Sequence, residues 1–352
     1  MSDKIPIIMC VDVEPDERIL DRTSPSPWRG FEATFDFFSK LRPRLASATG
    51  APVHFSWFFR MDPQVQETYG RADWPVKNYW SYVENFKQHG DAVGLHVHTY
   101  RWDKKRQTWV VDHADQAWAD YCVQTSFSAY RDFFKARCEF FRFGDKWISD
   151  ATLNLVERLG ARFDLTLEPG LFAATSIMKT EISTGSLPDF IGVPKVPYRR
   201  SKTNFRVADP SNKDGLWMIP LSTGVAGGMS GYLQKCYHLI RYPGVDRQPV
   251  FTLNLMHRSF TFLRVVNHLL GSLDKPYLAF IIQTSMLLRR DYAENMRKNF
   301  EKILSHPCAK RFVFSRPDEA IDLIGMGIGL RERRSMEEKL PNSHRFSKMK
   351  WF

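Results

Sequence analysis

The alternation of short β-type runs with longer helix-type segments constrains the fold of this chain more than any other feature. Five runs rich in β-branched and aromatic residues occur before residue 170, at 5–13, 52–59, 92–100, 140–144 and 161–167. Segments with the apolar period of an amphipathic helix separate them, at 30–47, 76–90, 114–138 and 149–160. Strands that alternate with helices pair in parallel, so the pattern predicts an α/β fold, either doubly wound or closed into a barrel.

The rhythm breaks between 171 and 248, where Pro, Gly and Lys are frequent and periodicity is weak. We interpret this region as a long elaborated connection. Strand and helix signals return at 249–257, 277–285, 291–306, 311–315 and 316–327. We therefore expect a single domain over residues 1–330.

Residues 331–352 form a basic C-terminal tail with seven Lys or Arg and three Glu. Such a segment is expected to be solvated. A weak contact with an anionic membrane surface, with Trp351 and Phe352 as apolar anchors, is the alternative.

The formal net charge of +11 favours anionic partners such as phosphorylated sugars, nucleic acid or an acidic membrane surface. The aromatic residues are not spaced with basic ones as on a nucleic-acid stacking face, so we predict no nucleic-acid partner. The five cysteines show no C-x-x-C spacing, and the N-terminal apolar run is short for a signal peptide or a membrane span. These features predict a cytoplasmic protein and leave its oligomeric state open.

Polar side chains gather at the ends of the predicted strands, where parallel α/β folds place their functional groups. Residues two apart on a strand point to the same face, so Asp12 pairs with Glu14, and His96 with His98. Two imidazoles with a carboxylate leave positions open for water and substrate, as catalytic metal sites do. The alternatives are acids that cap a turn or pair with Arg18, and histidines satisfied within an ordinary strand.

Three further residues follow strand ends. Arg142 is expected to meet the same cluster, where its planar donors could clamp Asp12 and keep it ionised, or to form a structural ion pair. Arg60 and Asp62 are candidates to bind substrate hydroxyls or a phosphate, or to form a salt bridge at the rim.

The order of motifs resembles the polysaccharide deacetylase family, also called the NodB-homology domain or carbohydrate esterase family 4. The resemblance spans roughly residues 5–325. "CVDVEPD" resembles the T-F-D-D motif, "DAVGLHVHTY" the E-[IV]-G-x-H motif, and "FRFGDKWIS" the F-R-x-P motif. "LGARFDLTLEPG" resembles the strand that follows, and "DGLWMIPLST" the strand before the family's last histidine motif.

The resemblance implies a distorted seven-stranded (β/α) barrel and metal-dependent removal of an N-acetyl group from an amino sugar. It implies that Asp12 is the general base, oriented by Arg142, and that Glu14, His96 and His98 bind a divalent metal. Zinc is the default expectation, with iron, cobalt, nickel or manganese as alternatives. Tyr100 and Trp147, which lie within the matching motifs, are candidate substrate contacts.

The chain departs from the family pattern at three positions. Val13 replaces the family's metal-binding Asp, so Glu14 must reach the metal instead or Asp12 must serve both roles. Tyr100 stands where the second histidine is usual, which leaves that role to His98. Gln283 replaces the histidine that protonates the leaving amine, and His257 is the alternative acid.

Three functions follow from these observations. The first is a metal-dependent deacetylase acting on an N-acylated sugar in an intracellular glycan or glycoside precursor. The second is a metal-free amidase on the same fold, in which Asp12, His96 and Arg142 bind the amide directly. The third is a carbohydrate-binding or regulatory protein that has lost catalysis through Gln283.

Overall fold

The computed structural model describes residues 3–173, 182–225, 236 and 250–326. Its main feature is a nine-stranded sheet in the order β13-β1-β2-β3-β6-β7-β10-β9, with β14 also paired to β1. All neighbours in it run parallel except β9 and β10. Its strands are β1 (Ile5–Val13), β2 (Ser56–Phe59), β3 (Ala92–Val97), β6 (Phe140–Phe143), β7 (Phe163–Asp164), β9 (Tyr198–Arg199), β10 (Trp217–Met218), β13 (Leu278–Gln283) and β14 (Phe312–Phe314).

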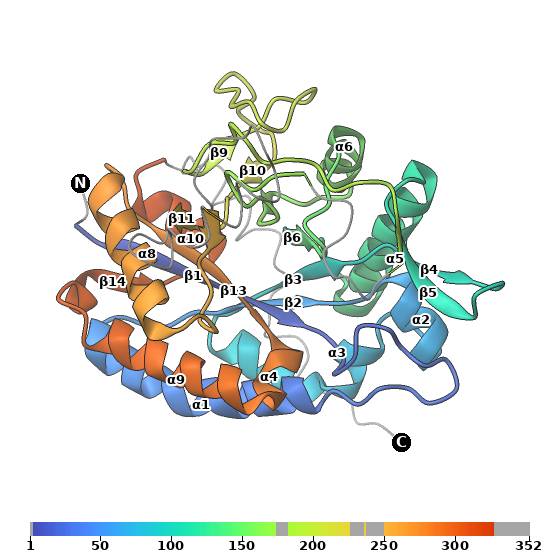
Figure 1. The fold of residues 1–352 in the computed structure, drawn as a ribbon, viewed down its shortest axis with the longest axis horizontal. Helices are drawn as coiled ribbons and strands as arrows, with labels where there is room; N and C mark the ends of the chain where they lie inside the picture. Colours follow the sequence, from blue (N-terminus) through green and yellow to red (C-terminus); the bar gives the residue numbers. More distant parts are fainter. Residues whose placement is uncertain (1–2, 174–181, 226–235, 237–249, 327–352) are drawn as a thin grey trace, which may run out of the picture.

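Helices cover the outside of this sheet, and two small sheets flank it (Figure 1). The helices are α1 (Arg29–Thr49), α2 (Pro63–Tyr69), α3 (Trp74–Asn78), α4 (Trp80–Gln88), α5 (Gln116–Phe134), α6 (Asp150–Arg158), α8 (Ser259–Ser272), α9 (Arg290–Leu304) and α10 (Pro317–Leu323), with 3₁₀ turns η1 (Thr284–Leu288) and η2 (Ala309–Arg311). The small sheets are β4 (Tyr100–Asp103), β5 (Thr108–Asp112) and β8 (Ser183–Thr184), and β11 (Thr223–Val225) with β12 (Val250–Thr252).

The segment that follows β10 draws the two sides of the sheet together into a distorted barrel. On one side, the amides of Ile219 and Leu221 donate to the carbonyls of Asp164 and Leu167, each at 2.8 Å. On the other, the amide of Ser222 donates to the carbonyl of Ala279 in β13, also at 2.8 Å. The predicted α/β barrel is therefore confirmed, and part of its wall comes from within the connection predicted at 171–248.

Alternate residues of each strand enter two separate cores. Outward side chains such as Trp57 and Phe59 pack against α1, where Phe31 meets the ring of Phe59 edge-on at 5.7 Å. Inward side chains form a second apolar cluster inside the barrel, which Ile321 and Ile324 of α10 join. Because α10 follows β14, which pairs with the first residues of β1, this helix closes the amino-terminal end of the barrel.

Most of the predicted elements agree with the structure, but several were missed, among them α2, the short strands β8, β9 and β11, and the two described next. Tyr100 does not continue the third strand but begins a hairpin, β4–β5, that projects to the right in Figure 1. The second omission is α8, which packs Phe262, Val265, Val266 and Leu269 into the outer core. The predicted basic tail lies outside the described residues. None of the helices described is long and apolar enough to cross a membrane.

Candidate active site and metal centre

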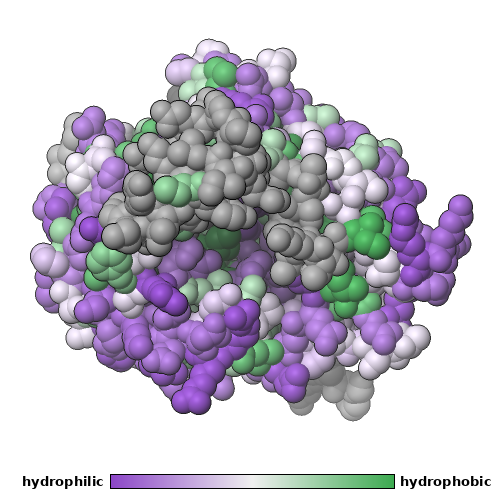
Figure 2. Space-filling view, viewed as in Figure 1, coloured by the Kyte–Doolittle hydropathy of each residue, from purple (hydrophilic) through white to green (hydrophobic). Residues whose placement is uncertain are grey.

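The carboxyl-terminal ends of β1, β3, β6 and β13 meet inside the barrel. Strand register places Asp12 beside Gln283 and His96 beside Arg142. Residues opposite each other on neighbouring strands share a face of the sheet, so these four lie on the inner one. In the space-filling view the surface is hollowed near its centre, in front of β1 and β13 (Figure 2).

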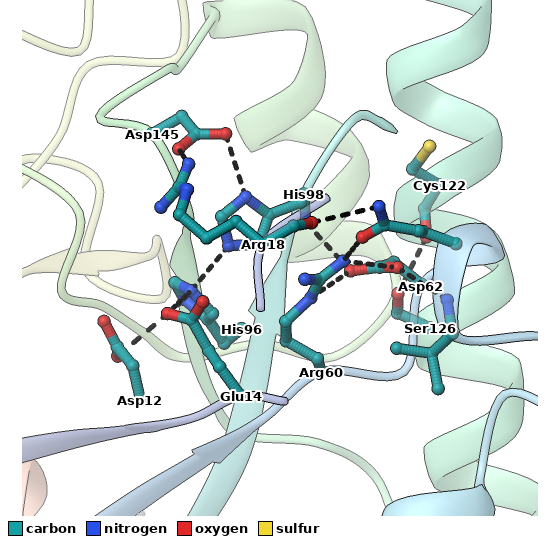
Figure 3. Close-up of polar contacts among 12 residues, drawn as sticks. Asp12, Glu14, Arg18, Arg60, Asp62, His96, His98, Cys122, Ser126 and Asp145 are labelled. Carbon is teal, nitrogen blue, oxygen red and sulfur yellow. Dashed lines mark hydrogen bonds and ion pairs between the residues drawn. The ribbon is translucent and has the colours of Figure 1, made fainter. Parts of the chain in front are cut away.

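Glu14, His96 and His98 converge from two strand ends (Figure 3). The Nε2 atoms of His96 and His98 are 2.9 Å apart, and Nε2 of His96 lies 3.3 Å from Oε1 of Glu14. All three side chains are at most 2% exposed. β3 ends at Val97, so His98 lies one residue beyond the strand and still faces His96.

Asp12 and Arg142 lie beside this trio. Oδ1 of Asp12 is 3.0 Å from Nε of Arg142 and 3.7 Å from Nδ1 of His96. The contact with Arg142 is an ion pair only, because neither oxygen of Asp12 has a hydrogen-bond donor among the described residues. Burial raises the pKa of Asp12, and the charge of Arg142 opposes that rise. Arg142 therefore favours the ionised carboxylate that a general base requires.

A tight turn after β6 supports the trio from the other side. Asp145 and Lys146 both have left-handed backbone conformations, with φ of 57° and 58°. Such angles are uncommon for residues with a side chain and cluster at functional sites. Oδ2 of Asp145 lies 2.8 Å from Nδ1 of His98, and Nζ of Lys146 lies 2.8 Å from Oε2 of the buried Glu168. Gly144 lies flat against His98, since a Cβ there would overlap the imidazole ring.

Most buried carboxylates around the site form ion pairs with cationic side chains, and the exceptions among the described residues are Glu14 and Asp164. Four of them form ion pairs with Arg or Lys: Asp12 with Arg142, Asp62 with Arg60, Asp145 with Arg18, and Glu168 with Lys146. Within the described part of the chain, Glu14 has no such pair, and Nε2 of His96 lies 3.3 Å from its Oε1. Burial alone would raise the pKa of Glu14, but its close contact with His96 holds that pKa well below its usual range. The carboxylate of Glu14 thus forms no ion pair with a Lys or Arg of the cluster.

The predicted substrate-binding residues are deeply placed. Arg60 and Asp62 are fully buried and face each other through two hydrogen bonds, of 2.8 and 3.0 Å. Asp62 also caps α2 and accepts the backbone amide of His98 at 3.4 Å. Tyr100 stacks on His98 with ring centroids 5.4 Å apart, whereas Trp147 stacks on His113. Contact of these side chains with substrate stays a prediction.

The two positions considered for the general acid lie on neighbouring segments, because Asn254 forms a parallel bridge with Ile281. Gln283 is the last residue of β13 and sits beside Asp12 on the inner face. His257 follows β12, and its Nε2 lies 3.0 Å from the carbonyl oxygen of Thr252. Burial lowers the pKa of His257, which makes it a poor carrier of a proton at neutral pH.

Sequence reasoning missed Asp145 and Glu168 and proposed a different partner for Arg18. Arg18 contacts Asp145, not the acids of "VDVE". A weak signal was present, because the strand-end segment "FRFGD" contains Asp145. Glu168 follows the strand "FDLTL" in the same way, at the carboxyl-terminal end of the barrel.

The residues of the trio fit a divalent metal. One ligand atom from each of Glu14, His96 and His98 lies within 4.8 Å of the others. Burial lowers the pKa of His98, which keeps the ring neutral as metal ligation requires. Oε1 of Glu14 and Nδ1 of His96 are buried without a hydrogen-bond partner among the described residues. Imidazole and carboxylate ligands suit zinc, iron, cobalt, nickel or manganese.

Comparisons with known proteins find similarity in structure only. No family model matches the sequence, and no curated protein matches it. A putative glycoside hydrolase/deacetylase from Parabacteroides distasonis aligns with TM-score 0.50 and 11% identity, over 92% of this chain and 72% of the other. A probable polysaccharide deacetylase from Pseudomonas aeruginosa PAO1 aligns with TM-score 0.46 and 12% identity, over 91% of each chain.

The Puue allantoinase aligns with TM-score 0.47 and 12% identity, over 91% of this chain and 90% of the other. At such identities the likeness concerns the fold and not the activity. The chain shares the distorted (β/α) barrel fold of the putative glycoside hydrolase/deacetylase from Parabacteroides distasonis.

Proposed function

We propose that this chain is a metal-dependent hydrolase that removes an N-acyl group, such as acetyl, from an amino sugar in an intracellular glycan or glycoside precursor. The observation that carries the proposal is the Glu14, His96 and His98 trio next to the Asp12–Arg142 ion pair. The proposed metal ligands thus lie next to a separate carboxylate, at the end of the barrel where such folds place their functional groups. The barrel type agrees with this class of reaction.

Glu14, His96 and His98 would hold the metal. When bound there, a divalent metal would supply a Lewis acid for the amide carbonyl and would lower the pKa of water. Asp12 accepts the proton of the attacking water at a carboxylate oxygen, as a general base. Arg142 stabilises the ionised form of Asp12 before the proton is transferred.

The leaving amine must gain a proton, and Gln283 has no acidic proton to give. Loss of a general acid typically costs about 10²- to 10⁴-fold in rate. We therefore expect slow turnover. A chain that binds a sugar without cleaving it is the second candidate, and Gln283 is the observation that favours it.

The test is acetate release from N-acetylated amino sugars offered as nucleotide-linked, lipid-linked and small glycoside substrates. We expect release by the wild type, loss with a strong chelator, and loss in a His96→Ala, His98→Ala double variant. A matched control replaces His89 and His306, which follow α4 and α9, outside the barrel. Equal release by the site variant would contradict the proposal. Release that survives chelation would favour a metal-free amidase.

A further inference from the structure

Asp145 lies between two partners that both act as donors. Its Oδ1 contacts Nη2 of Arg18, and its Oδ2 is 2.8 Å from Nδ1 of His98. Figure 3 shows Asp145 and His96 at opposite edges of the His98 ring. The side chain of Asp145 is 2% exposed, so water does not compete for these contacts.

The chemistry of the two partners fixes the proton on His98. An ionised carboxylate only accepts hydrogen bonds, and a guanidinium only donates them. Arg18 therefore occupies one oxygen of Asp145 as a donor and stabilises the charged form. The other oxygen must then accept a hydrogen bond from the Nδ1–H group of His98. A neutral ring with its proton on Nδ1 has its lone pair on Nε2, the atom that faces His96.

The backbone around Asp145 supports the same arrangement. A left-handed residue directs its side chain differently from an extended one, and here that conformation aims the carboxylate back at His98. Gly144 lets the turn approach the ring, and Tyr100 stacks on the ring at 22°. The ring is thus held on its face by packing and on its edge by Asp145.

We propose that Asp145 is a positioning residue that holds His98 in its Nδ1–H tautomer, with Arg18 deciding which oxygen of Asp145 faces the ring. Nε2 of His98 is thereby free to bind a metal. The proposal deepens the proposed function and rests on it only where it concerns metal binding. Partners of this kind typically change metal affinity by about 10- to 100-fold.

The informative variant is Asp145→Asn, because asparagine has the same shape and tolerates a left-handed backbone. Arg18 will attract the amide oxygen, so the amide NH₂ will face Nδ1 of His98. Nδ1 of His98 must then accept a hydrogen bond from this NH₂ group, so the ring proton moves to Nε2. We expect zinc affinity, measured by competition with a chromophoric chelator, to fall about 10- to 100-fold.

A double variant, Arg18→Met with Asp145→Asn, separates this mechanism from simple damage. Without Arg18 the amide can turn its oxygen towards His98 and restore the Nδ1–H tautomer. We expect the double variant to bind zinc more tightly than Asp145→Asn alone. If the double variant binds zinc no better, the proposed role of Arg18 is overturned.

Asp91→Asn is the matched control. Asp91 is also buried and paired with an arginine, since its oxygens accept from Arg42 at 2.6 and 2.9 Å, but it lies outside the barrel mouth. We expect Asp91→Asn to lower thermal stability and to leave zinc affinity unchanged. An equal loss of affinity in both Asp→Asn variants would mean that Asp145 acts only through the stability of the fold.

The tautomer itself is read from the nitrogen NMR shifts of the His98 ring in metal-free wild-type protein. The proposal predicts a proton on Nδ1 in the wild type and on Nε2 in Asp145→Asn. A wild-type proton on Nε2, or an Asp145→Asn variant with unchanged tautomer and zinc affinity, would overturn it. If the wild type binds no zinc but shows the Nδ1–H tautomer, the proposed metal fails and the role of Asp145 stands.

Discussion

The two ends of the barrel interior are lined by the same strands with opposite kinds of side chain. At the amino-terminal end, Ile8 and its register partner Ala279 pack with α10 into an apolar cluster. Four residues further along β1 from Ile8 lies Asp12, among buried acids, histidines and arginines. The inward-facing residues of these strands therefore have two roles. Apolar side chains at one end stabilise the barrel, and that stability offsets the cost of burying charged side chains at the other end.

The largest effect expected at the polar end is on catalysis. Asp12→Asn removes the proposed general base while keeping its shape, and we expect kcat/KM for acetate release to fall about 10²- to 10⁴-fold. Zinc content should be retained, because Asp12 is not one of the three proposed ligands. A variant with the wild-type rate would remove Asp12 from the mechanism.

At the apolar end we expect loss of stability without loss of binding. Ile321→Ala in α10 leaves a cavity in the inner core and should lower the free energy of unfolding by about 2–5 kcal/mol. Urea denaturation measures this, and zinc affinity of the folded variant should match the wild type. A large fall in affinity would mean that the two ends are not independent.

Gln283 offers a change that adds function. Gln283→His places an ionisable ring beside Asp12, and we expect acetate release to rise about 10²-fold. Gln283→Asn is the matched control, since it alters the side chain without supplying an acid. If the histidine variant is no faster than the asparagine variant, protonation of the leaving amine does not limit the reaction.

Asp164 tests how much stability a buried carboxylate costs when it forms no ion pair. It accepts hydrogen bonds from Thr166 but forms no ion pair among the described residues, and burial raises its pKa to about 6. As pH rises from about 4 to 6, the unfolded chain loses this proton first, so the folded state loses stability. Asp164→Asn should therefore become more stable than the wild type by about 1–3 kcal/mol above pH 6, and not at pH 4. A pH-independent difference would contradict this.

Much of the barrel could be predicted because its signals are local. The strand ending at Val13 and the helix beginning at Arg29 show clear apolar periods, and strand ends in parallel folds meet in space. That rule brought Asp12, Glu14, His96 and His98 together before any coordinates. The period of α8 was equally readable, with apolar residues at 262, 265, 266 and 269, and it was overlooked.

The residues that hold the site in place could not be predicted, because their contacts join positions far apart in the sequence. Asp145 in "FGDKW" has the sequence of an ordinary turn, and nothing local indicates that it faces Arg18, 127 positions earlier. The hairpin that begins at Tyr100 could not be predicted for the same reason, because the run "HVHTY" has the pattern of a single strand. In the structure β3 ends at Val97, and the amide of the next residue, His98, donates to Asp62.

The central claim is that Glu14, His96 and His98 hold a metal. It is tested most directly by metal content per chain, measured by plasma mass spectrometry on protein purified without chelators or a histidine tag. The account predicts near-stoichiometric divalent metal in the wild type and a background level in the His96→Ala, His98→Ala variant. No metal in either protein, or equal metal in both, would contradict it.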